Sequence, residues 1–173
     1  EVATLREAAR EAAAAVGANA PRFLGLSDNR LDSLPLLDVI KPIEAVVDEV
    51  RPSIVYTHHG GDLNIDHRVV HRAVLTACRP TPDSPVMAIY AFEVLSSTAW
   101  GAGRSDEFIP SRFVNIESHL DSKLAALRCY DSEMRDFPHA RSLTAVTALA
   151  TFRGAIAGMA AAEAFMVMRQ RML

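Results

Sequence analysis

Apolar residues recur every three or four positions along much of the chain, and this spacing predicts amphipathic helices. In residues 3–16, Leu5, Ala9 and Val16 fall on one stripe among charged neighbours, and Gly17 follows as a stop. The same spacing predicts further helices over residues 36–50, 66–77, 118–134 and 144–172. Asp66 stands where the N-cap of the third of these five helices belongs.

Short runs of β-branched and aromatic residues lie between these helices and predict strands. The clearest is Ser53–Thr57 (SIVYT), and the others cover residues 22–26, 86–95 and 113–116. Strands that alternate with helices indicate an α/β protein, with a Rossmann-like, doubly wound, mostly parallel sheet and helices on both faces. A length of 173 residues favours a single domain over residues 1–173.

Charge and hydropathy exclude some classes of partner. The net charge is −3 and basic residues alternate with acidic ones, so no basic stripe is available for nucleic acid. The most apolar run, residues 154–168, contains Glu163 and is shorter than the roughly 20 residues of a membrane span. No signal peptide is visible, and we expect a cytoplasmic protein that binds a small molecule; homo-oligomer formation is left open.

The segment after SIVYT is the richest in chemistry. Residues 58–67 read HHGGDLNIDH, which concentrates imidazoles and carboxylates where a strand turns into a helix. A carboxylate in such a loop can fix the tautomer of a metal-binding imidazole. A catalytic zinc in general takes three protein ligands and keeps one position for water, and this segment offers one or two. The alternative is an aspartate N-cap flanked by solvent-exposed histidines.

Residues 55–74 resemble the second signature of the PIG-L/LmbE family, an Asp-x-His/Asn-x-Asp-His pattern after a strand. Three other stretches agree with that family in the expected order: LSDNRLDS (26–33), YDSEMRDFPHARS (130–142) and RGAIAGMAAAEAF (153–165). The resemblance implies a metal-dependent hydrolase that removes the N-acetyl group of an N-acetylglucosamine-type sugar or glycoconjugate. The implied cofactor is zinc or another divalent metal ion.

The resemblance also implies roles for residues of the loop. His67 would be a zinc ligand, and Asp66 would orient the polar group that activates the substrate carbonyl. Many relatives hold a histidine at the position of Asn64. Asn64 would instead donate a hydrogen bond to an oxyanion, as side-chain amides do elsewhere, or His59 would supply the ring.

Four residues outside the loop are implied to bind substrate. Asp32 matches the place of a carboxylate that contacts sugar hydroxyls, and Arg6 matches an arginine that reaches the substrate from the first helix. His139 and Arg141 follow a proline break, on a loop that would cover the pocket. The alternatives are a turn-forming aspartate, an exposed helical arginine and an ordinary solvated loop.

The first signature of the family, His-Pro-Asp-Asp, is absent, although it would supply the other zinc ligands and the general base. Neither His-Pro nor Asp-Asp occurs in the 173 residues, and the chain opens at Glu1. We therefore expect a fragment that lacks the first βαβ unit, inactive alone and active as a zinc-dependent N-deacetylase when that segment is present. The alternative is a degenerate member that binds a sugar or a partner without turnover.

Overall fold

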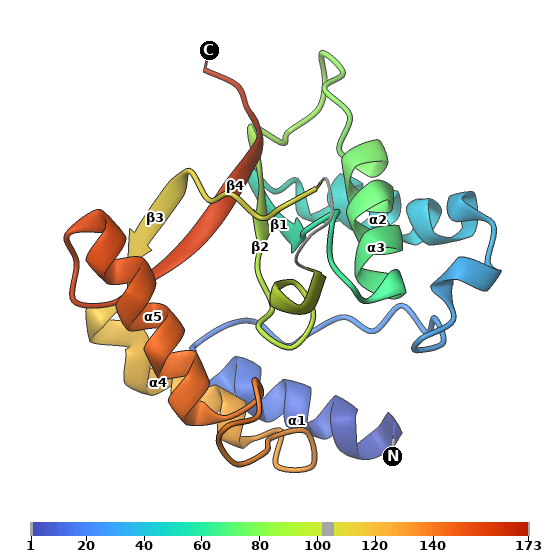
Figure 1. The fold of residues 1–173 in the computed structure, drawn as a ribbon. Helices are drawn as coiled ribbons and strands as arrows, with labels where there is room; N and C mark the ends of the chain where they lie inside the picture. Colours follow the sequence, from blue (N-terminus) through green and yellow to red (C-terminus); the bar gives the residue numbers. More distant parts are fainter. Residues whose placement is uncertain (1, 102–105, 173) are drawn as a thin grey trace. The chain divides into compact units, whose positions relative to one another are not determined.

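A computed structural model describes residues 2–101 and 106–172, which form two compact units (Figure 1). Residues 24–112 and 164–172 make up one of them, here called the site unit. Residues 2–23 and 113–163 make up the other, here called the helical unit. The prediction of a single domain over the whole chain stays a prediction.

The sheet has four strands in the order β1-β2-β4-β3. In the site unit β1 (Ile54–His58) pairs parallel with β2 (Ala88–Phe92), and β2 pairs antiparallel with β4 (Ala162–Gln170). The last strand of the order is β3 (Arg112–Asn115). The sheet is therefore mixed, and the predicted α/β class is confirmed.

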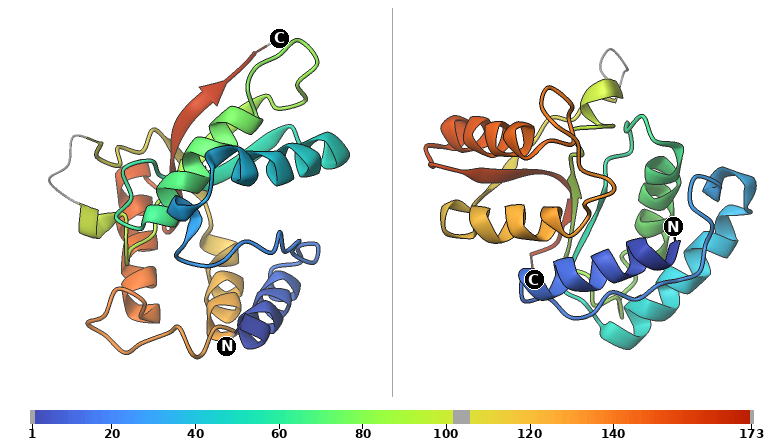
Figure 2. Two further views of the ribbon diagram at one scale, coloured as in Figure 1. Left: turned by 90° about the vertical axis from the view of Figure 1, so that its right-hand side faces the viewer. Right: turned by 90° about the horizontal axis from the view of Figure 1, so that it is seen from below.

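Two helices pack together in the site unit. The first, α2 (Leu36–Val50), runs through Pro42 without a break, and α3 (Ile65–Ala77) lies beside it (Figure 2). Their shared core consists of Val39, Ile40 and Ala73. A second cluster joins both helices to β2 through Val47, Val74, Cys78, Val86 and Ile89. These contacts pack α2 and α3 together and against β2.

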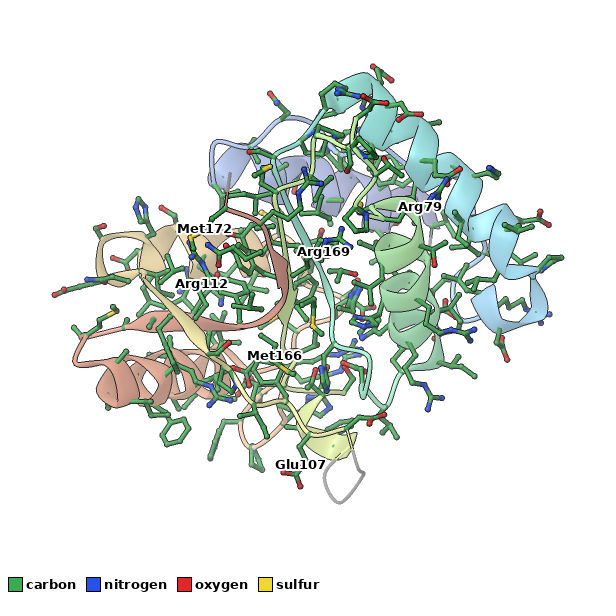
Figure 3. All side chains as sticks on the ribbon, turned by 90° about the horizontal axis from the view of Figure 1, so that it is seen from above. Arg79, Glu107, Arg112, Met166, Arg169 and Met172 are labelled. Carbon is green, nitrogen blue, oxygen red and sulfur yellow. The ribbon has the colours of Figure 1, made fainter. Side chains whose placement is uncertain are left out.

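Two of the predicted elements are wrong. Residues 22–26 form no strand, because Gly25 adopts a φ of 75° that an extended strand cannot contain. The predicted helix over residues 144–172 covers only α5 (Leu143–Ala157), which ends at Gly158 with a left-handed φ of 70°. The residues beyond form β4 and pair with β2. Figure 3 labels Arg169 on this strand, and its guanidinium donates to the Cys78 carbonyl.

The helical unit contains α1 (Val2–Ala15), α4 (Leu120–Arg128) and α5, with α1 alongside α4 (Figure 2). Short 3-10 turns cover Leu31–Ser33 and Ala99–Gly101 in the site unit and Glu117–His119 in the helical unit. Gly154 lies very close to the backbone after α5, since a Cβ there would be 2.6 Å from the Met159 carbonyl oxygen. In the two ranges that the structure describes, no helix combines the length and apolarity needed to cross a bilayer.

Candidate metal and substrate site

The loop between β1 and α3 is organised around the cap of α3. Asn64, and not Asp66 as predicted, is the N-cap: its Oδ1 accepts from the backbone N–H of Asp66 at 2.8 Å and of His67 at 3.4 Å. Asn64 reaches these donors because its backbone is extended (φ −67°, ψ 126°). Asp66 therefore lies inside the first helical turn, where its carboxylate faces the positive end of the helix dipole.

Two glycines let the loop run close to its neighbours. A Cβ on Gly61 would lie 2.0 Å from the carbonyl oxygen of Asp106, and one on Gly60 would lie 2.9 Å from the His71 ring. Gly61 therefore requires glycine, because the atom in the way is backbone, whereas a side chain at Gly60 would displace the His71 ring.

Asp62 is the central carboxylate of the loop and is fully buried. Its Oδ1 accepts from the backbone N–H of Asn64 at 2.8 Å and lies 3.2 Å from His67 Nδ1. Its Oδ2 accepts from Ser97 Oγ at 3.0 Å and from Thr98 Oγ1 at 2.6 Å. Burial alone would raise the pKa of Asp62, but these hydrogen bonds together lower it to about 2. Asp62 is thus a carboxylate at neutral pH.

His58 stacks on His67, with ring centroids 3.9 Å apart. Burial, followed by the neighbouring His67, lowers the pKa of His58 to about 4, so its ring is neutral at pH 7. The buried Nδ1 of His58 has no hydrogen-bond partner among the described residues. His58 ends β1 and His67 lies in the first turn of α3, so the stack joins the end of the strand to the start of the helix.

His59 and His71 both hold the loop through carbonyl oxygens. The ring of His59 is 5% exposed, bonds Asp106 O through Nε2 at 2.9 Å and meets Phe108 edge-on. His71 Nδ1 bonds the His58 carbonyl at 2.7 Å, and burial lowers the pKa of this ring. The geometry therefore gives both rings an evident structural function, and a catalytic role for His59 stays a prediction.

Asp66 connects the loop to the segment that carries Asp32. The Asp66 side chain is buried, and its Oδ1 accepts from the backbone N–H of Leu31 at 3.0 Å. Leu31 opens the 3-10 turn Leu31–Ser33, so Asp66 fixes the backbone immediately before Asp32, whose side chain is exposed. An orienting role for Asp66 toward Asn64 and a sugar-binding role for Asp32 stay predictions.

Arg6, His139 and Arg141 lie in the helical unit. The guanidinium of Arg6 stands 5.3 Å from the centre of the Phe23 ring. His139 Nδ1 accepts from the backbone N–H of Arg141 at 3.0 Å, and the Arg141 side chain pairs with Glu133. All three are exposed, and their predicted contacts with substrate stay predictions.

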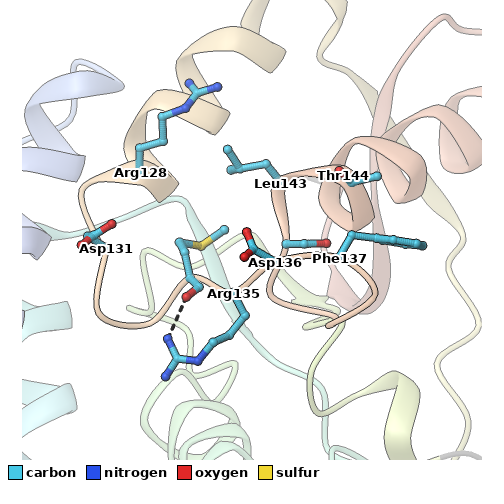
Figure 4. A pocket seen from close by; sticks show the side chains of 9 residues that line it. Arg128, Asp131, Arg135, Asp136, Phe137, Leu143 and Thr144 are labelled. Carbon is cyan, nitrogen blue, oxygen red and sulfur yellow. Dashed lines mark hydrogen bonds between the residues drawn. The ribbon is translucent and has the colours of Figure 1, made fainter.

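The helical unit has a cavity of about 680 Å³ between the end of α4 and the start of α5 (Figure 4). Arg135 lies on its wall, with the guanidinium donating to the Met134 carbonyl at 2.7 Å. Asp131, Asp136 and Arg128 add charge of both signs. Neither His139 nor Arg141 lines this cavity, so it does not bear on their predicted role.

Among the described residues, His67 is arranged to supply one ligand to a metal ion. Asp62 holds Nδ1 of His67, and the described residues give Nε2 of that ring no hydrogen-bond partner, which leaves this nitrogen for a ligand. Within residues 2–101 and 106–172, no group of three His, Cys, Asp or Glu side chains is placed to hold an ion. The chain thus offers His67 as a donor and not a complete set.

Several of these residues were missed by the sequence analysis. The Asp-x-Asn spacing of residues 62–64 is typical of a carboxylate that bonds the backbone two residues later, so Asp62 had a local signal. Ser97 and Thr98 had none, because they meet Asp62 from 35 and 36 positions away.

Comparison with known protein families agrees with the resemblance found in the loop between β1 and α3. Residues 1–78 match the PIG-L family model, described as GlcNAc-PI de-N-acetylase. The match includes Asp32 and the whole segment from β1 through α3. Residues 1–78 thus resemble the PIG-L family. The family resemblance predicted from the sequence is confirmed.

Two curated relatives of this PIG-L-like chain are named as deacetylases. The uncharacterized deacetylase YaiS of Escherichia coli K12 is 31% identical over 132 residues, which are 73% of this chain and 64% of that protein. The probable N-acetyl-alpha-D-glucosaminyl L-malate deacetylase 2 of Bacillus cereus is 30% identical over 127 residues, 72% of this chain and 54% of that protein. The chain spans less than two thirds of either relative.

Solved structures share the fold. The N,N'-diacetylchitobiose deacetylase of Pyrococcus horikoshii superposes with a TM-score of 0.75 at 19% identity, over 96% of this chain and 63% of that one. GalB, the 4-carboxy-2-hydroxymuconate hydratase of Pseudomonas putida KT2440, gives 0.76 at 22%, over 99% and 73%. Because these two enzymes differ in activity, the shared fold alone does not select a reaction.

Proposed function

We propose that this chain forms part of a metal-dependent N-deacetylase that acts on an N-acetylated sugar. The observation that carries the proposal is the buried Asp62 carboxylate at Nδ1 of His67, an arrangement typical of a metal-binding imidazole. The names of both curated relatives favour deacetylation over the hydration reaction of the structural neighbour.

In the proposed reaction, water adds to the acetamide carbonyl, the C–N bond breaks, and acetate and a free amine leave. A bound divalent metal supplies a Lewis acid and lowers the pKa of water. His67 would hold that ion through Nε2.

Asn64 would act on the substrate carbonyl. Its Oδ1 is used by the helix cap, so the Nδ2 amide protons are the part of this side chain left to donate to a developing oxyanion. Asp32 would accept from sugar hydroxyls, on a backbone that Asp66 holds through the Leu31 N–H. Substrate contacts of Arg6, His139 and Arg141, which belong to the helical unit, are proposed from the family resemblance alone.

A non-catalytic protein that binds a sugar or a partner is the second candidate. The observation that favours it is that the described part of the chain brings together no three-ligand group. The two candidates differ in their need for His67, since sugar binding by itself requires no metal donor.

Acetate release from N-acetylglucosamine and its glycosides, measured on the protein that contains this chain, tests the proposal. We expect metal-dependent release that a chelator abolishes and that His67→Ala reduces by at least about 100-fold. His119→Ala replaces an exposed histidine of the helical unit and is the matched control. Full activity of His67→Ala, or a folded protein that binds the sugar and releases no acetate, would contradict the proposal.

A further inference from the structure

The surroundings of His67 determine which of its ring nitrogens carries the proton. Nδ1 lies 3.2 Å from Asp62 Oδ1 and 3.4 Å from Ser97 Oγ. A carboxylate oxygen only accepts hydrogen bonds, so an unprotonated Nδ1 would set a lone pair against Asp62. The Ser97 hydroxyl is committed elsewhere, since it donates to Asp62 Oδ2 at 3.0 Å.

The Asp62 carboxylate is itself held from three directions, so it cannot turn away from His67. The Val94 N–H donates to Thr98 Oγ1 at 2.8 Å, and the hydroxyl of Thr98 is oriented to donate to Asp62. The backbone N–H of Leu63 donates to the Ser97 carbonyl at 3.3 Å, which ties the turn after β2 to the loop after β1. Asp62 is also fully buried, so water does not compete for these bonds.

From this geometry we infer that Asp62 is a positioning residue that keeps the proton of neutral His67 on Nδ1 and the lone pair on Nε2. Ser97 and Thr98 hold the carboxylate in place. The consequence for metal binding rests on the proposed function, whereas the tautomer does not. The stacked ring of His58, 3.9 Å away, restricts rotation of His67 out of this orientation.

The inference also identifies what Asp62→Asn would change. The amide replaces one accepting oxygen by an NH₂ group, and both oxygens of Asp62 face donors: Asn64 N–H and His67 on one side, Ser97 and Thr98 on the other. At the Oδ2 position the NH₂ group meets two hydroxyls, which can turn to accept, but at the Oδ1 position it sets a donor against the protonated Nδ1 of His67. The second arrangement is relieved by moving the His67 proton to Nε2. Loss of the negative charge weakens the preference for Nδ1–H in either arrangement, so the population of the Nε2–H tautomer rises.

Long-range ¹H–¹⁵N correlation spectra of the ¹⁵N-histidine-labelled chain measure the tautomer directly, without metal. The sequence contains six histidines, and the His67 signals are assigned by their loss in His67→Gln. The spectra are recorded at a pH at which the His67 ring is neutral; there we expect its proton on Nδ1 in the wild-type chain and a larger Nε2–H population in Asp62→Asn. A neutral wild-type His67 with its proton on Nε2 would overturn the inference.

Thr98→Val removes one hydrogen bond to Asp62 with little change of shape and serves if Asp62→Asn does not fold. Zn²⁺ titration followed at the His67 Nε2 signal should show affinity on the order of 10-fold weaker for this variant. The control is Thr76→Val, which replaces an exposed helical threonine whose hydroxyl donates to the Arg72 carbonyl. An unchanged tautomer and an unchanged Zn²⁺ affinity in Thr98→Val would contradict the role of Thr98 in holding the Asp62 carboxylate. Because this chain supplies one ligand, the Zn²⁺ titration uses the protein that contains it. In that protein, an Nδ1–H tautomer without Zn²⁺ binding would contradict the proposed function and leave the positioning role intact.

Discussion

Replacing Asn64 separates its cap from its proposed role toward the substrate, because the two use different atoms of one amide. Oδ1 accepts from the N–H groups of Asp66 and His67, and Nδ2 is left to donate. Asn64→Ala removes both functions. Asn64→Ser keeps a hydroxyl oxygen that caps the helix, but it loses the amide donor.

The cap sets the expected effect on stability. Loss of a side-chain N-cap costs about 1 kcal/mol, within a range of about 0.5–2 kcal/mol, so Asn64→Ala should lower the free energy of unfolding by that amount. Asn64→Ser should stay within about 0.5 kcal/mol of wild type, since serine caps nearly as well. For a chain of this length the difference in Tm is about 2–4 °C per kcal/mol.

Urea unfolding of wild type, Asn64→Ala and Asn64→Ser measures the contribution of the helix cap to stability. Acetate release by the protein that contains this chain measures the contribution of the Nδ2 donor to activity. We expect Asn64→Ser to be as stable as wild type yet slower by on the order of 100-fold, as for the loss of one oxyanion donor. Equal stability of Asn64→Ala and wild type would refute the stabilising effect of the Asn64 cap. Undiminished activity of Asn64→Ser would refute the donor role while leaving the cap in place.

Two further predictions concern stability. Burial, followed by the neighbouring His67, lowers the pKa of His58 from its ordinary value of 6.5 to about 4 in the folded chain, so the unfolded state takes up the proton first as pH falls. Urea unfolding should therefore show a loss of about 3 kcal/mol between pH 6.5 and 4, and His58→Gln should reduce that slope; an equal slope would contradict the assignment. Gly154→Ala should destabilise by about 1–3 kcal/mol, because its Cβ would lie 2.6 Å from the Met159 carbonyl oxygen. A variant as stable as wild type in the same assay would show that the close approach relaxes freely.

Local patterns in the sequence determined the element that carries the chemistry. The SIVYT run, the two glycines and the helical spacing over residues 66–77 predict a strand, a loop and a helix, and the structure has β1, that loop and α3 in nearly those places. The prediction holds because capping and helical periodicity depend on residues within a turn or two of each other. The cap itself was placed two residues late, since Asn64 and Asp66 are both good caps and only the backbone geometry distinguishes them.

Tertiary structure alone decided the rest. The Ala-rich stretch after Gly158 has the composition of a helix, but pairing with β2 makes it the strand Ala162–Gln170, because ladder hydrogen bonds and burial outweigh a weak intrinsic preference. The hydrogen bonds that hold the Asp62 carboxylate likewise need Ser97 and Thr98, which reach the loop only through the pairing of β1 with β2. The sequence thus identified the imidazole that would bind metal. The fold determined which of its nitrogens faces the carboxylate, since that contact joins residues that no local spacing relates.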